Sequence, residues 1–148
     1  MKAAIAAILF LLAPAAQAGP REDVRAIYER FVAAQNARDV PAMRSLLLDR
    51  PEFLWVSNGQ SFWGRETMLA RLTSYQSNAV WRARPDLTHA VVVEVSPTSA
   101  FIHLPLALDI GTAAHSFNET RFLVSGLFVK TAQGWKISAL FTTIQNPD

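Results

Sequence analysis

The C-terminal part of the chain predicts a long β-hairpin, and this feature constrains the fold more than any other. Residues 121–130 are apolar on both alternating faces, residues 131–134 have turn composition, and residues 135–143 form the returning strand. A hairpin that is apolar on both faces is stable in water only when each face is covered. We therefore expect helices on one face of this hairpin and further protein on the other.

The first 18 residues are typical of a secretory signal peptide. Lys2 supplies a short positive start, residues 3–12 form an apolar run, and residues 16–18 form a small-x-small cleavage site. The run is too short to span a bilayer, and no lipidation cysteine follows, which disfavours the alternative of a membrane anchor. We expect cleavage after Ala18 and a single mature domain, residues 19–148, that is periplasmic or secreted and free of the membrane.

Charge and cysteine content exclude several classes of protein. Without Lys2 the chain has 13 basic and 12 acidic side chains, and they form no basic stripe of the kind that binds nucleic acid. The absence of cysteine excludes disulfides, a thiol nucleophile and zinc–thiolate ligation. His89 and His115 have no partner at metal-ligand spacing. We therefore expect no metal, no cofactor and no nucleic-acid partner.

Helix signals occupy the first half of the mature chain. Apolar residues at helical spacing predict a helix from Pro20 to about Ala37, and Asp39 is placed to cap a second, short helix. Asn58-Gly59 is the strongest hairpin signal in the chain. Gly64 opens a third helical pattern.

Strand signals occupy the second half. Segments 79–84, 88–95 and 100–110 precede the C-terminal hairpin, and residues 111–114 have turn composition. Pro105, in the middle of a strand, suggests a sheet edge or a bulge. This order predicts an α+β fold, with three N-terminal helices packed in the concave face of a strongly curved, mixed or antiparallel sheet.

Several short motifs carry a resemblance to a known superfamily. They are FVAAQNARD at residues 31–39, the Asn58-Gly59 turn, Gly64-Arg65-Glu66 at a helix start, and Gly134-Trp135-Lys136-Ile137 near the C-terminus. In this order and spacing they resemble the nuclear transport factor 2-like superfamily, especially its SnoaL-like and ketosteroid-isomerase-like members, over nearly all of the mature chain. The resemblance implies a cone-shaped domain with a pocket at its wide end, and it implies homodimers.

The resemblance does not extend to the isomerase catalytic residues. In that family a phenol on the first helix and a protonated acid on the penultimate strand hold the oxyanion, while an Asp removes the proton. The matching positions here are Phe31, Gly126 and Trp55, whose side chains offer neither donor nor carboxylate base. The resemblance therefore implies the pocket without the isomerase chemistry.

The register of the last strands decides which side chains face the pocket. With loops at 111–114 and 131–134, His103 falls opposite Phe122. The resemblance supports the same face as concave, because residues 139–141 match an isomerase segment whose alternate residues line the steroid pocket. A slip of one residue would exchange the two faces. The expected ligand-binding residues are Phe31, Trp55, Tyr75, Phe101, His103, Phe122, Gly126, Phe128 and Phe141.

His103 is the only expected pocket residue that titrates near neutrality, so it is the candidate catalytic base. The alternative is a core histidine that is satisfied by a neighbouring hydroxyl or carbonyl. Asp109 cannot complete a dyad with it, because the intervening strand separates them by roughly 20 Å. The other polar candidates are Gln35, Ser57, Tyr75 and Asn118.

Three functions stay open on the sequence. The first is a binding module that holds a small apolar or aromatic molecule without transforming it. The second is a SnoaL-like isomerase, cyclase or dehydratase that uses His103 as its general base. The third is a pure interaction domain whose cone is filled by its own side chains. The volume of the pocket and the polar atoms inside it separate the three.

The face opposite the expected pocket predicts association. In the register above it carries Ile102, Leu104, Leu106, Leu108, Leu123, Leu127 and Leu140. Left bare, these residues would form a larger apolar patch than a soluble monomer normally exposes. We therefore expect a homodimer through the convex face, with Leu104 and Leu106 near its centre.

Overall fold

The structure is a computed structural model that describes residues 19–77, 80–113 and 116–146. The signal-like segment 1–18 and His115 lie outside the described residues. The elements in chain order are α1 (Pro20–Ala37), α2 (Val40–Leu46), β1 (Leu54–Ser57), β2 (Gln60–Trp63), α3 (Arg65–Tyr75), β3 (Val80–Pro85), η1 (Leu87–His89), β4 (Val91–Ser96), β5 (Ser99–Ala113), β6 (Ser116–Thr131) and β7 (Gly134–Ile144). No helix in these ranges is both long and apolar enough to cross a membrane.

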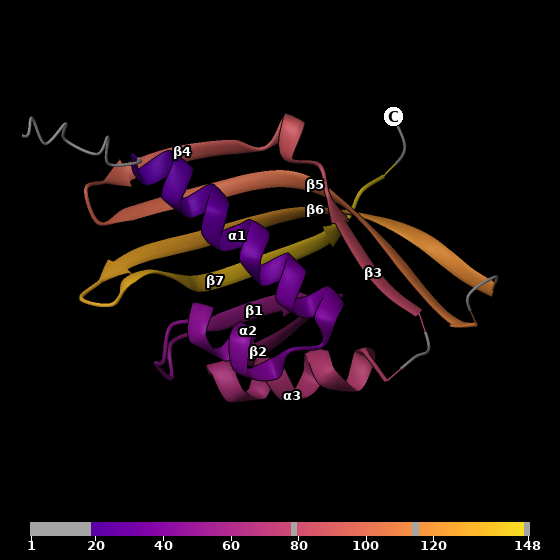
Figure 1. Ribbon diagram of the computed structural model, residues 1–148. Coiled ribbons are helices and arrows are strands. Elements are labelled where there is room, and N and C mark those ends of the chain that lie inside the picture. Colours follow the sequence, from indigo (N-terminus) through magenta and orange to yellow (C-terminus); the bar gives the residue numbers. More distant parts are fainter. Residues whose placement is uncertain (1–18, 78–79, 114–115, 147–148) are drawn as a thin grey trace, which may run out of the picture.

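The strands form one curved, open sheet in the order β2-β1-β7-β6-β5-β3, and β4 pairs with the remaining part of β5. Neighbouring strands are antiparallel, except that β1 runs parallel to β7. Figure 1 shows α1 lying across one face of this sheet, with α2 and α3 beside β1 and β2. The α+β prediction of three N-terminal helices on a mixed sheet is confirmed.

Local chemistry explains where the N-terminal elements begin and end. The Asp39 carboxylate accepts a hydrogen bond from the Ala42 N–H at 3.0 Å and so caps α2. Asn58 and Gly59 have φ angles of 51° and 72°, the left-handed pair that a two-residue hairpin turn requires. The Asn36 side chain, at the end of α1, bonds to the backbone of β3 and ties this helix to the sheet.

Pro105 lies where β5 changes its outer partner. β4 pairs with the first part of β5 and β3 with the second part. Between them the Asp86 N–H donates to the Pro105 carbonyl at 2.9 Å. The nitrogen of a strand residue points to the same side as its carbonyl, so the missing N–H of Pro105 faces this gap and costs the sheet no ladder hydrogen bond.

The predicted register between β5 and β6 is wrong. β5 continues to Ala113, and Phe122 lies opposite Leu106 rather than His103, a displacement of three residues. Gly111 does not begin a turn but lies inside the strand, next to a register shift between Gly111 and Ala113. An isolated glycine is common at such an irregularity. Because the displacement is odd, it exchanges the two faces of β5.

An irregularity in β7 exchanges the faces of its second half. The turn before β7 forms as predicted. Leu127 then lies opposite Ala139, whereas Phe128 lies opposite Ile137, which leaves Ser138 without an opposite residue. The extra residue turns Ala139 to the convex face, where the prediction had placed it on the concave one. β6 itself keeps the predicted facing.

The corrected register places the aliphatic row of β5 in the core. Ile102 and Leu104 have no exposed surface, because the helices cover them. Leu106 belongs to the same concave row and packs against the core. The expected dimer centre at Leu104 and Leu106 is therefore wrong, since neither side chain faces outward.

The convex face carries a different apolar set. Residues that lie directly opposite each other on neighbouring strands share a face of the sheet. On the convex face they form two neighbouring rows that run across β4, β5, β6 and β7. Their large apolar members are 37% to 55% exposed, and we call them the convex patch. The convex patch consists of Val91, Val93, Phe101, Leu127 and Phe141.

A charge network lies beyond the convex patch, toward the far ends of β5 and β6. Asp109 is fully buried and lies directly opposite Glu119. Arg84 bonds to both carboxylates, to Glu119 at 2.6 Å, and so offsets their mutual repulsion. The role of Asp109 in this fold is to hold three strands together.

The inverted facing of β7 has a measurable consequence for stability. Leu140 is 3% exposed and Phe141 is 40% exposed. We expect Leu140→Ala to lower the free energy of unfolding by about 2–5 kcal/mol, as for other buried leucines. In the monomer, Phe141→Ala should lower it by less than about 1 kcal/mol, because 40% of the larger side chain already lies in water. Urea unfolding of both variants checks this, and a larger loss for Phe141→Ala would restore the original register.

Candidate functional site

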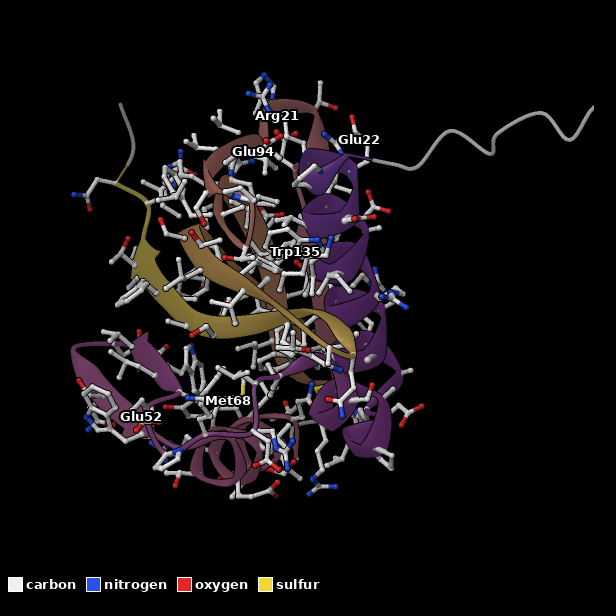
Figure 2. All side chains as sticks on the ribbon, turned by 90° about the vertical axis from the view of Figure 1, so that its left-hand side faces the viewer. Arg21, Glu22, Glu52, Met68, Glu94 and Trp135 are labelled. Carbon is white, nitrogen blue, oxygen red and sulfur yellow. The ribbon has the colours of Figure 1, made fainter. Side chains whose placement is uncertain are left out.

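The interior between the helices and the sheet holds a cavity of about 180 Å³. Met68, on the inner side of α3, contributes to its wall (Figure 2). The other lining residues come from α1, from α3, from the strands β1, β3, β5, β6 and β7, and from the turn after β1. They are Tyr28, Phe31, Gln35, Trp55, Ser57, Asn58, Leu72, Tyr75, Trp81, Ala83, Leu106, Leu108, Ile110, Phe122, Val124, Leu140 and Thr142.

Four of the expected ligand-binding residues line this cavity: Phe31, Trp55, Tyr75 and Phe122. The Trp55 ring lies 6.1 Å from the Tyr75 ring, edge to face, and 5.2 Å from the ring of Phe62. Such offset aromatic contacts are favourable beyond their buried area. Trp55 and Tyr75 therefore form one contiguous aromatic part of the cavity wall.

Gly126 and Phe128 face the concave side as predicted but do not reach the cavity. A Cβ added at Gly126 would lie 3.1 Å from Phe128, 3.3 Å from Leu140 and 3.4 Å from Ile102. The space beside this glycine is thus filled by core side chains. Phe128 itself is fully buried.

Phe101, His103 and Phe141 were expected in the pocket, and that facing is wrong. All three lie on the convex face, because the register shift in β5 and the extra residue in β7 turn them outward. Phe101 is 37% exposed and Phe141 is 40% exposed. None of the three lines the cavity.

The environment of His103 matches the alternative that it is a satisfied structural histidine. Its Nδ1 lies 2.9 Å from the hydroxyl oxygen of Ser125, directly across the β5–β6 ladder. Asp109 has Arg84 as its partner, which agrees with the exclusion of a His103–Asp109 dyad. Asn118 is exposed and, like Asp109, lies outside the cavity lining.

Sequence reasoning missed Tyr28 as a cavity residue, although the signal was present. Tyr28 precedes Phe31 by three positions on α1, so both side chains must share one face of that helix. Tyr28 is 3% exposed, and burial raises the pKa of its phenol. The predicted polar candidates Gln35, Ser57 and Tyr75 also line the cavity.

The chemical character of the cavity is neutral and mostly apolar. Its lining in the described part of the chain contains no carboxylate, imidazole, amine or thiol. The polar groups that remain are phenols, amides, hydroxyls and the indole groups of Trp55 and Trp81. Among the residues described, no group of three or more His, Cys, Asp or Glu side chains is arranged to hold a metal ion. This wall can enclose and orient a molecule, but it offers no side chain suited to proton abstraction near neutral pH.

Known structures share this fold at low sequence identity. A nuclear transport factor 2-like protein from Salmonella enterica serovar Typhimurium aligns with a TM-score of 0.76 and 11% identity, over 86% of this chain and 92% of that one. A proposed dehydratase of the nuclear transport factor 2-like family from Streptomyces avermitilis aligns with a TM-score of 0.74 and 17% identity, over 85% of this chain and 97% of that one. A ketosteroid-isomerase-like protein from Erwinia carotovora atroseptica aligns with a TM-score of 0.69 and 17% identity, over 86% of this chain and 97% of that one. At these identities the likeness concerns the fold alone.

The sequence itself gives a family match that covers most of the chain. A comparison with curated proteins gave no match. Residues 24–140, from the first turns of α1 to the middle of β7, match the SnoaL-like domain. This range includes every wall of the cavity except Thr142. The chain therefore belongs to the SnoaL-like domain family, and it shares its fold with nuclear transport factor 2-like proteins.

Proposed function

We propose that this protein binds a small, largely apolar molecule in the cavity between α1, α3 and the sheet. The observation that carries the proposal is the cavity of about 180 Å³ with its mostly apolar wall. A protein cavity of roughly 150 Å³ lined by Leu, Ile and Phe binds benzene, whereas drug-sized ligands occupy sites of roughly 300–1,000 Å³. The size therefore favours a ligand of about one aromatic ring.

Binding is favoured over catalysis by the groups that surround the cavity. Two structural neighbours are described as a proposed dehydratase and a ketosteroid-isomerase-like protein. A shared activity would need an acid and a base beside the ligand, and His103 faces the other side of the sheet. The phenol of Tyr28 is a poor base, because burial raises its pKa and keeps it protonated.

Toluene is a suitable first probe, because it matches the cavity in size and lacks polar atoms. We expect toluene to shift the amide NMR resonances of cavity residues, such as Leu108 and Val124, in the wild-type mature protein. Val124→Phe should abolish the shifts by filling the cavity, at a cost of about 1–3 kcal/mol in stability. Phe141→Leu, on the opposite face, should leave them unchanged.

Two results of the toluene titration would contradict the proposed function. One is the absence of shifts in the wild-type protein at the solubility limit of toluene. The other is a set of shifts confined to the convex patch, which would place binding on the outer surface. The wild-type mapping needs no variant, so the test holds even if Val124→Phe folds poorly.

We further propose that a second copy of this chain covers the convex patch. The patch crosses four adjacent strands, and the two polar residues in its rows, His103 and Ser125, bond to each other. A two-fold axis through such a surface would pair apolar rows with apolar rows. The charged side chains of Arg84, Glu119 and Arg121 would then lie at the rim, where they can fix the orientation.

Charged substitutions test the dimer. We expect the double variant Phe101→Lys with Leu127→Lys to sediment as a monomer, because it buries two charges in the centre of the contact. Ile144→Lys serves as the control, since Ile144 is 60% exposed but lies opposite Phe122, outside the convex patch. A wild-type protein that sediments as a monomer at micromolar concentration would defeat the proposal.

Export completes the proposed function. It is supported by the signal-like composition of residues 1–18, with its apolar run and small-residue cleavage site. A binding domain released into the periplasm or medium would meet small apolar molecules outside the cytoplasm. N-terminal sequencing of the exported protein should begin at Gly19, and an intact Met1 would exclude cleavage.

A further inference from the structure

Two hydrogen-bond donors in the cavity lining have no partner among the described residues. The Nε1–H of Trp81 is buried and donates to no acceptor among the described residues. The hydroxyl of Tyr28, which also lines the cavity, makes no hydrogen bond to the described residues, but it is not one of the fully buried atoms. A buried donor without an acceptor is unfavourable, and native proteins rarely leave one. The buried Trp81 donor, with the Tyr28 hydroxyl in the same lining, points to an acceptor that enters with the ligand.

The same wall argues against a charged ligand. No charged side chain lines the cavity in the described part of the chain. The Arg71 guanidinium lies over the Tyr75 ring, 4.5 Å from its centroid, but does not belong to the lining. A charged molecule would lose its hydration here without gaining a counter-charge. The Tyr28 phenol stays protonated, because burial raises its pKa, so it can serve as a donor.

We infer that the ligand is a neutral, single-ring molecule with a hydrogen-bond acceptor, to which Tyr28 and Trp81 donate. This inference rests on the proposed binding function and narrows it to a ligand class. Both donors occupy different sequence positions from Phe31, Gly126 and Trp55, at which the isomerase groups of related proteins would fall. The proposed polar contact therefore uses other sequence positions than the isomerase groups do.

A pair of isosteric probes tests the inference. Acetophenone carries a carbonyl oxygen, and α-methylstyrene replaces that oxygen by a methylene group of similar shape. We expect the wild-type mature protein to bind acetophenone about threefold to tenfold more tightly, the range for neutral hydrogen bonds. NMR titration or calorimetry measures both affinities.

Three variants assign the preference to its donors. Tyr28→Phe and Trp81→Phe should each reduce the preference for acetophenone while keeping the affinity for α-methylstyrene. Trp135→Phe is the matched control, because Trp135 also has a buried, unpartnered Nε1 but lies outside the cavity lining. It should keep the full preference.

The outcomes separate this inference from the proposed function. Equal affinity for the two probes in the wild-type protein would overturn the inference and leave the binding function standing. Binding of neither probe would contradict both. Tighter binding of benzoate than of acetophenone would overturn the neutral character. A preference for acetophenone that survives both Tyr28→Phe and Trp81→Phe would show that these side chains are not the donors. The wild-type comparison decides the ligand class even if a variant fails to fold.

Discussion

The register of β5, β6 and β7 is the constraint on which the rest of the structure depends. Side chains alternate across a strand, so a shift by an odd number of residues exchanges core for surface. The irregularity near Gly111 and the extra residue Ser138 each produce such a shift, one on either side of β6. Together they bring Leu140 and the aliphatic row of β5 inside and leave Phe101 outside.

The element order could be predicted from local signals, because Asp39, Asn58-Gly59 and Gly64 act within a few residues of themselves. The register could not, because Gly111 resembles a turn residue and nothing local marks Ser138 as an extra residue. One stronger signal was available in β5. Its branched aliphatic residues occupy every second position from Ile102 to Ile110, and such a face belongs in a core more readily than a face holding His103 and Asp109.

The corrected register changes the chemistry that the domain can perform. Moving His103 to the convex face leaves the cavity with no group that titrates near neutrality, and Ser125 satisfies the imidazole there. The cavity therefore has no candidate base for proton transfer. Its wall instead includes the aliphatic side chains of β5, which suit an apolar molecule. The same correction gives the convex face an apolar surface suited to a second copy, so a single register links the binding site to the proposed dimer.

The apolar cavity between α1, α3 and the concave side of the sheet underlies the proposed binding function. A crystal of the mature protein under xenon pressure tests it most directly, because xenon enters apolar cavities without needing a specific polar contact. Xenon density is expected in contact with Leu72, Leu108 and Leu140. Xenon found only on the convex face, or a concave interior closed by the rings of Trp55 and Trp81, would contradict it.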